Sequence, residues 1–401
     1  RPNQAARPTL PEPLPDSPAR DILRHALQWL LRHHREDAPT SRPRSLLPEA
    51  SQLVVRRQDS LHDLHQHRVW KEILTLFNDM NQRNHSIDIL KFVCATLIVC
   101  LHTYSKWHDD FIPLTRCAVP CFLMISGFLL YSEKGIGRER LVRTIKHIFH
   151  IIVWSTLLFA VVTESRAIAK DGVFIPSGKD WLYCFALNEN PFGYHLWYLQ
   201  AYLYVLPLML IVDKYKLWKL MLCATPLLLL GNTVLGAYGQ LIFQQVFPVE
   251  YMRNFLFTGI PYFMVGVFLK MHIHKLLTVN RLLYLGGIIL FSITTVMEKV
   301  MILRLEYTPD NENYISTTLL AVCLFLFVAS FQNTQDSTIS SIGEKDSLYI
   351  YIFHPLIILI LAKLSSKMPE AFQTFYLWTA PLFVLILTTI ASIALRKTKL
   401  L

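Results

Sequence analysis

The chain has 401 residues, of which 53% are hydrophobic and 17% are charged. Soluble domains average about 45–50% apolar and about 25% charged residues, and here the apolar residues come in blocks long enough to cross a hydrocarbon layer of ~30 Å. These properties exclude a large soluble helical protein. The net charge is +10, but the basic residues sit in short connections between apolar blocks, as in the inner loops of membrane proteins. The positive charge therefore indicates contact with membrane lipid and not a nucleic-acid partner.

The first part of the chain differs in composition from the rest. Residues 1–79 hold eleven Arg and one Lys with many Pro, whereas residues 80–401 hold ten Arg and seventeen Lys. Amphipathic patterns predict two helices at 19–35 and 61–77. Met80 opens "MNQRNHSIDILKF", an ordinary start for a bacterial inner-membrane protein. We interpret the first part as an Arg/Pro-rich extension that is not native to the enzyme, and the second part as the membrane domain.

Ten apolar blocks predict an all-α integral membrane protein, a bundle of about ten transmembrane helices. Their lengths fit helices that cross a bilayer. We expect the spans at 87–104, 117–132, 147–164, 195–212, 218–235, 255–270, 281–297, 317–332, 347–363 and 375–395.

The distribution of Lys and Arg among the connections predicts the orientation of the bundle. One set, "EKGIGRERLVRTIK", "DKYKLWK", "KMHIHKLLTVNR" and the tail "RKTKLL", is densely basic, whereas the alternate set is longer and of mixed charge. The connection 333–346 belongs to the first set although it is weakly basic. We expect the first set to be cytoplasmic, and both termini with it because the number of spans is even. The expected location is a bacterial cytoplasmic (inner) membrane.

The first span carries two polar residues that a simple membrane anchor would not need. Lys91 and His102 are eleven residues apart in "DILKFVCATLIVCLH", so in an α-helix they project from one face about 16 Å apart along the axis. Each has an ordinary explanation, because Lys91 can snorkel to the inner headgroups and His102 can be an interfacial histidine. Asp88, one turn before Lys91, can pair with it and lower the cost of its burial.

This span resembles the first helix of the membrane acyltransferases of acyltransferase family 3, which carry a basic residue, ten intervening residues and a histidine. Here the pattern is Asp88-Ile-Leu-Lys91 and then His102, with Lys91 in place of the usual Arg. Lysine lacks the planar fork that grips phosphate or carboxylate with two hydrogen bonds. Over nearly all of residues 83–401, further segments resemble family motifs: "CFLMISGFLL", "RLVR" in the connection before the third span, "HLWYLQAYL" and "SLYIYIFHPLI".

The resemblance implies an O-acyltransferase that moves an acyl group from cytoplasmic acyl-CoA to a hydroxyl of a cell-surface or lipid-linked carbohydrate. The donor would be acetyl-CoA, with succinyl-CoA as an alternative. His102 would act as general base, since an imidazole can take the hydroxyl proton and return it to the leaving thiolate, and acyl-histidine formation is the alternative. Lys91 would steady the phosphate or pantetheine end of the donor. Arg138, Arg140 and Arg143 would hold the CoA phosphates, unless they are ordinary positive-inside charge.

Residues of later spans are expected to bind the acceptor. His195, Trp197 and Tyr198 open an outer-facing helix, where an aromatic belt explains Trp and Tyr but not the histidine. His354, with Tyr351 one turn before it, is expected to face the bundle interior and to line the site.

Three further residues are expected to support the site structurally. Ser126 and Gly127 lie in "MISGF", where packing of small residues against the first helix is favoured over a serine nucleophile. Asp88 is the third, as the partner of Lys91.

No metal site is expected. Two groups of histidines have short spacings, but no Cys or carboxylate set completes a zinc site, and a solvated helix face or a loop explains them better. These groups are His62, His65 and His67, and His272 and His274.

Two other interpretations remain open. A transporter or flippase of a glycan precursor or small metabolite would use the intramembrane polar groups to line a path without acyl chemistry. A membrane sensing or substrate-supply domain is the third interpretation. A cytoplasmic CoA-binding mouth on the side of Lys91 would favour the acyltransferase, because a transporter does not need acyl-CoA.

Overall fold

The computed structural model describes residues 84–307, 313–333 and 335–398. Contacts divide the chain into Arg1–Asn81 and Gln82–Leu401, and every described residue belongs to the second unit. The predictions for residues 1–79, including the two amphipathic helices and the histidines His62, His65 and His67, lie outside the described residues, as does the start proposed at Met80.

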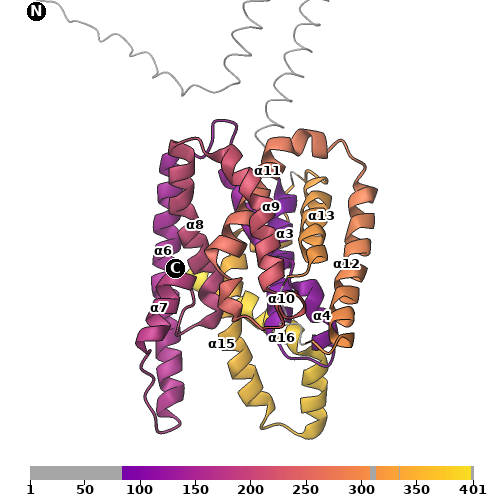
Figure 1. Cartoon of the computed structure of the whole chain (residues 1–401). Helices are drawn as coiled ribbons and strands as arrows, with labels where there is room; N and C mark the ends of the chain where they lie inside the picture. Colours follow the sequence, from indigo (N-terminus) through magenta and orange to yellow (C-terminus); the bar gives the residue numbers. More distant parts are fainter. Residues whose placement is uncertain (1–83, 308–312, 334, 399–401) are drawn as a thin grey trace, which may run out of the picture. The chain divides into compact units, whose positions relative to one another are not determined.

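The described part of the chain is built from helices, which confirms the predicted fold class (Figure 1). In chain order these are α3 His85–His102, α4 His108–Thr115, α5 Ala118–Leu130, α6 Arg138–Ile168, α7 Gly178–Leu187, η1 Tyr194–Leu196, α8 Trp197–Lys214, α9 Trp218–Leu235, α10 Gly239–Phe243, η2 Val249–Tyr251, the π-helical turn η3 Phe255–Gly259, α11 Ile260–Leu276, α12 Arg281–Arg304, α13 Ile315–Ala329, α14 Thr338–Lys345, α15 Ser347–Ser365 and α16 Glu370–Lys397.

Nine helical segments within the described residues are long and apolar enough to cross a membrane, and Ile315–Ala329, at the predicted span 317–332, is a shorter apolar helix. The 15 residues of this helix rise only about 22 Å, less than the ~30 Å of a hydrocarbon core. The chain is thus a multi-pass membrane protein. We call the end of the bundle at which α3 begins the inner end, and the opposite end the outer end.

Two boundaries differ from the predictions. The second crossing begins at His108 and not at 117, because α4 and α5 form one apolar stretch, His108–Leu130, that encloses Arg116. The third crossing helix, α6, begins at Arg138, so the "RLVR" motif lies in its first turns and not in the connection before it. A helix of 31 residues is about 46 Å long, so α6 extends well beyond the hydrocarbon layer.

Glycines allow α5 and α11 to pack closely against each other. A Cβ on Gly127 of α5 would lie 2.0 Å from the carbonyl oxygen of Phe263, and one on Gly266 of α11 would lie 2.0 Å from that of Met124. The two backbones therefore touch, as in other membrane helix pairs with small residues at the interface. The expected packing of Gly127 against the first helix is wrong, since its close partner is α11.

The connection 333–346 contains a helix that was not expected. Gly343 of this helix, α14, packs directly on the backbone of Asp88 at the start of α3, where a Cβ would lie 1.8 Å from the Asp88 carbonyl oxygen. The next residue after α14, Asp346, is fully buried and accepts two hydrogen bonds from Arg396 of α16, at 3.0 and 3.2 Å. The inner end of α3 is thus held by elements from the end of the chain.

Candidate active site

Three histidines from distant parts of the chain meet in one cluster. His102 is the last residue of α3, His195 lies in η1 before α8, and His354 lies in the second turn of α15. The rings of His102 and His354 are stacked with centroids 5.1 Å apart, and those of His195 and His354 meet edge to face at 5.6 Å. The structure therefore brings the three predicted histidines together.

Pro355 explains how His354 is held. A proline has no N–H, so the carbonyl four residues earlier loses its helical partner. In α15 this carbonyl belongs to Tyr351, and Nδ1 of His354 lies 2.7 Å from its oxygen. Because a carbonyl can only accept, Nδ1 carries the proton and Nε2 has a lone pair. This Nε2 is buried without a hydrogen-bond partner among the described residues.

His195 is fixed by the same helix. Its Nε2 lies 3.2 Å from the carbonyl oxygen of Ile352 and so donates a hydrogen bond to it. The hydroxyl of Tyr351 donates in turn to the backbone carbonyl of His195. The ring of Tyr351 also packs at 5.4 Å against that of Tyr198 in α8. Tyr351 and Tyr198 therefore position the histidines from behind.

A small cavity of about 40 Å³ opens onto the cluster. His102, His195, Tyr351 and Trp197 line it. The side chain of His102 is exposed, whereas those of His195 and His354 are buried. His102 is therefore the histidine that a substrate can reach, and the buried imidazoles lie beside it.

The same cavity contains residues that the sequence predictions missed. Arg116, between α4 and α5, and Arg253, before η3, line it together with Thr258 and Asn313. Both arginines were assigned to connections, because the predicted spans began just after them. A single Arg inside an apolar stretch of 23 residues, His108–Leu130, was the available signal, since intramembrane charges mark functional sites.

Lys91 lies toward the other end of α3. Its Nζ is 2.9 Å from Oδ1 of Asp88, and the two side chains are 17% and 3% exposed. The expected Asp88–Lys91 pair is thus present. His85 Nδ1 lies 3.8 Å from the second carboxylate oxygen of Asp88. Lys91 does not line the His102 cavity, so any role in the reaction would be at a distance from the imidazole.

A second cavity, of about 500 Å³, lies at the inner end. Asp88, Arg140 and Lys270 contribute its charged groups, and the Lys270 ammonium lies 4.9 Å from the centre of the Phe128 ring. Lys270, in α11, was not anticipated. Arg138 and Arg143 are exposed on α6 and do not line this cavity, so the structure brings only Arg140 of the three predicted arginines to it.

Ser126 makes a local contact within its own helix. Its hydroxyl donates a hydrogen bond of 2.9 Å to the carbonyl of Phe122, one turn earlier. Such a bond satisfies the hydroxyl within the helix. It agrees with a structural role for this residue.

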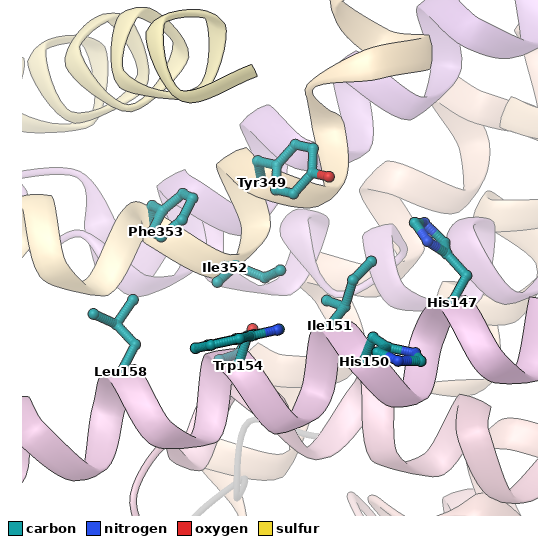
Figure 2. A pocket seen from close by; sticks show the side chains of 9 residues that line it. His147, His150, Ile151, Trp154, Leu158, Tyr349, Ile352 and Phe353 are labelled. Carbon is teal, nitrogen blue, oxygen red and sulfur yellow. The ribbon is translucent and has the colours of Figure 1, made fainter. Parts of the chain in front are cut away.

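An apolar groove of about 230 Å³ lies behind the cluster, between α6 and α15. Six of its residues come from α6 and three from α15, and most of them are labelled in Figure 2: His147, His150, Ile151, Trp154, Ser155 and Leu158, and Tyr349, Ile352 and Phe353. Ile352 contributes to both the groove and the histidine cluster, since it lines the groove and its carbonyl accepts the hydrogen bond from His195. The groove and the histidine cluster therefore share one wall.

A third cavity, of about 420 Å³, meets the cluster at His195 near the outer end. Its charged side chains are Arg166, Asp180 and Glu189. Burial raises the pKa of Glu189, and the carboxylates of Glu250 and Asp180 act in the same direction. This cavity therefore offers polar groups of both signs next to a buried imidazole.

Comparisons with known proteins agree with this architecture. A family model described as an acyltransferase domain, acyltransferase 3, matches residues 84–397. An "Amino-acid racemase" of Enterococcus faecalis is 26% identical over 317 residues, which are 72% of this chain and 43% of that protein. A "Serine/alanine racemase" of Enterococcus gallinarum is 30% identical over 132 residues, 30% of this chain and 18% of that protein.

The chain spans less than half the length of these curated relatives. The acyltransferase domain, by contrast, matches most of the chain, from the cap of α3 to the last residue of α16. It includes all three clustered histidines and the inner cavity. The chain therefore belongs to acyltransferase family 3, as a multi-pass membrane protein.

Proposed function

We propose that the protein is a membrane O-acyltransferase that moves an acyl group from cytoplasmic acyl-CoA to a hydroxyl of a cell-surface or lipid-linked carbohydrate. The acyl group that we propose is acetyl. The observation that carries this proposal is the position of His102, the one accessible ring in a cluster whose other two imidazoles are buried and oriented by backbone hydrogen bonds. A general base needs to be both reachable and oriented.

In the proposed reaction, His102 takes the proton of the acceptor hydroxyl while its oxygen attacks the thioester carbonyl. The C–O ester bond forms, the C–S bond breaks, and the proton passes from His102 to the departing thiolate of CoA. His354 presents a lone pair on Nε2 within the same stack, so it can share the positive charge that develops on the neighbouring imidazole. His195, Trp197 and Tyr351, which line the cavity, would orient the acceptor, and Tyr198 would support Tyr351 through the contact of their rings.

The inner cavity supports the donor side of the proposal. CoA carries several phosphate charges, and Arg140 and Lys270 supply two cations on the wall of a cavity of about 500 Å³. Arg138 and Arg143 lie on the same end of α6 and would add to the positive field outside it. Lys91, paired with Asp88, would steady the pantetheine arm between this cavity and His102.

Replacing His102 tests the chemistry. We expect His102→Ala to lower acyl transfer by about 100-fold or more, since a positioned general base contributes about 10²–10⁴-fold. The measurement is the O-acetyl content of surface glycans from cells that express the full chain, with the amount of membrane-inserted protein determined in parallel. His274→Ala, on an exposed histidine of the last turn of α11, is the matched control. Wild-type acylation by stable His102→Ala protein would contradict the proposal.

The names of the relatives favour a second candidate function, a membrane module that supplies an amino acid. Relatives called amino-acid and serine/alanine racemases match this chain over less than half of their length, and a bilayer-crossing module could deliver their substrate. Uptake of radiolabelled serine by vesicles containing the full chain distinguishes the two functions. Uptake that survives His102→Ala, together with unaltered glycans, would favour the supply module.

A further inference from the structure

Two of the cavities described above follow each other along the same pair of helices. The apolar groove lies between residues 147–158 of α6 and 349–353 of α15, and the cavity of about 420 Å³ lies next along both helices, at residues 159–166 and 355–359. We call this second cavity the outer cavity. Both helices run from the groove toward it, as the residue numbers in Figure 2 show for the groove. Together the two form a seam along α6 and α15 that leads toward the outer end.

The groove half of the seam is suited to a hydrocarbon chain. In Figure 2, Trp154 and Leu158 of α6 project toward Ile352 and Phe353 of α15. Trp154 is 65% exposed on a helix long and apolar enough to cross a membrane, so this wall faces lipid. The 11 residues from 147 to 158 rise about 16 Å along α6, roughly half of a ~30 Å hydrocarbon layer. The groove therefore matches the depth to which the chain of one leaflet reaches.

The outer half of the seam is suited to a sugar. Arg166, Asp180 and Glu189 line the outer cavity together with Phe174 and Phe192, whose rings meet edge to face at 5.9 Å. A guanidinium donates hydrogen bonds to sugar oxygens, and carboxylates accept them from sugar hydroxyls. Pockets for small molecules combine such a small number of polar groups with aromatic walls. The outer cavity therefore offers partners to a head group that is rich in hydroxyls.

The loop between the two halves is fixed to α6. Nδ2 of the buried Asn190 donates to the hydroxyl of Thr156 at 2.8 Å, and the hydroxyl of Thr163 donates to the carbonyl of Phe192 at 3.1 Å. Oδ1 of Asn190 accepts from the amides of Phe192 and Gly193, at 3.1 and 3.2 Å. Thr156 and Thr163 lie on either side of the point where the groove gives way to the outer cavity. The backbone that leads to His195 is therefore held in place along the seam.

His195 connects the seam to the proposed general base. Its ring meets that of Phe159 of α6 edge to face at 4.5 Å, and its Nε2 bonds the carbonyl of Ile352 in the groove wall. It lines both the outer cavity and the cavity that exposes His102. A sugar bound in the outer cavity therefore lies against the same imidazole that borders the His102 cavity.

We propose that the seam binds the acceptor as a glycolipid, with its hydrocarbon chain in the apolar groove and its sugar in the outer cavity beside His195. The order of the two halves along α6 is that of a lipid in the leaflet at the outer end, whose chain points to the bilayer centre and whose head group lies at the surface. A sugar without a chain would leave the groove unused, and a phospholipid would leave the sugar partners unused. This inference rests on the proposed function, because it selects the lipid-linked carbohydrate among the proposed acceptors.

Photolabelling of the purified full chain in phosphatidylcholine nanodiscs tests this inference without turnover. The probe is dodecyl glucoside with a diazirine in its chain, and cross-links should map to residues 147–158 or 349–353. Dodecanol with the same diazirine should label these residues on the order of tenfold less, because it lacks the hydrogen bonds of the sugar. Dodecyl glucoside with the diazirine on its sugar should label residues 189–195.

Filling the groove tests the chain half separately. Ser155 is buried in the groove wall, and Ser155→Phe should lower chain labelling on the order of tenfold, since each buried CH₂ group contributes roughly fourfold in affinity. Val153→Phe is the matched control on the same helix, at a position that lines neither the groove nor the outer cavity, and should leave labelling unchanged. Leu158→Trp is a second variant of the same wall. The wild-type maps decide the question even where a variant fails to fold.

The outcomes separate this inference from the proposed function. His102→Ala should keep both labels, since it removes the base and not the seam. Equal labelling by the glucoside and dodecanol probes would show a groove for any lipid chain and would overturn the inference, as would sugar labels outside the outer cavity or chain labels that survive in folded Ser155→Phe protein. Acylated surface glycans in cells, together with a seam that takes no label, would overturn this inference and leave the proposed function standing.

Discussion

The pair His354–Pro355 shows how one residue sets the chemistry of its neighbour. Without the proline, the Tyr351 carbonyl would accept the N–H of residue 355 as in any α-helix. With it, that carbonyl is left for the imidazole, and the 2.7 Å contact with Nδ1 fixes the tautomer. A helix-breaking residue therefore serves to orient a buried histidine.

Pro355→Ala should separate function from stability. The new N–H can bond the Tyr351 carbonyl and displace His354, while the helix gains up to about 3 kcal/mol from removal of the proline. We expect acyl transfer to fall about tenfold or more, a typical penalty for misplacing a group that supports general base catalysis, while the unfolding temperature stays equal or rises. Pro226→Ala in α9 is the matched control, with unchanged transfer expected. A loss of stability with full activity in Pro355→Ala would contradict this prediction.

At the scale of helices, the contact between α5 and α11 fixes the relative position of the two elements that carry Arg116 and Arg253. Arg116 lies just before α5 and Arg253 just before the π-helical turn that leads into α11. Gly127 and Gly266 allow the two backbones to touch, and this contact sets the separation of the helices. The width of the cavity thus depends on glycines that do not line it.

Gly127→Ala should destabilise the protein by about 1–3 kcal/mol, the usual cost of an overpacked contact. The reason is that the new Cβ would lie 2.0 Å from the Phe263 carbonyl oxygen, an atom that cannot move aside alone. The measurement is the thermal unfolding midpoint in detergent. Gly286→Ala in α12, where a Cβ would meet nothing within 4 Å, should be neutral or slightly stabilising because alanine favours helix. Equal midpoints for the two variants would contradict the argument.

Much of this arrangement could be predicted from sequence. Apolar block length gives the crossings and the helical fold, and the motif resemblance gives His102, His195 and His354 before any contact is known. The arginines were missed because hydropathy places a charge outside a span, whereas Arg116 is enclosed between α4 and α5. α14 was missed because its polar sequence, "TISSIGEK", gains its helix from packing on α3 and from capping by Ser337. The position of Arg116 and the formation of α14 both depend on tertiary contacts, which hydropathy and local sequence do not describe.

At the scale of the whole molecule, the nine crossing helices of the described residues and the shorter α13 run between two ends of the bundle. Asn84, Arg140 and Lys270 line one cavity at the end where α3 begins, and Arg396 pairs with Asp346 next to α14, which packs on the start of α3. In Figure 1 the connection between α11 and α12 lies at this same end. The positive-inside rule assigns this end to the cytoplasm. The orientation of the termini follows as a prediction.

Cysteine labelling in intact cells tests this orientation. Ile175→Cys, in an 81% exposed position of the connection between α6 and α7, should react with an impermeant maleimide added outside. Val279→Cys, at a 37% exposed position between α11 and α12, should react only after the membrane is opened. The parent chain, which has an exposed Cys223, sets the background. The reverse pattern would invert the topology and place Arg140 outside.

The cluster of His102, His195 and His354 also dictates the order in which the protein can become active. Of the described helices, the ribosome makes α3 first and α15 near the end. Until α15 arrives, His195 lacks the Ile352 carbonyl, and the start of α3 lacks both α14 and the Asp346–Arg396 pair behind it. The nascent chain therefore lacks these contacts to α3 and His195 through most of its synthesis. We therefore predict that truncation anywhere before residue 355 leaves a bundle in which the histidine cluster is not assembled.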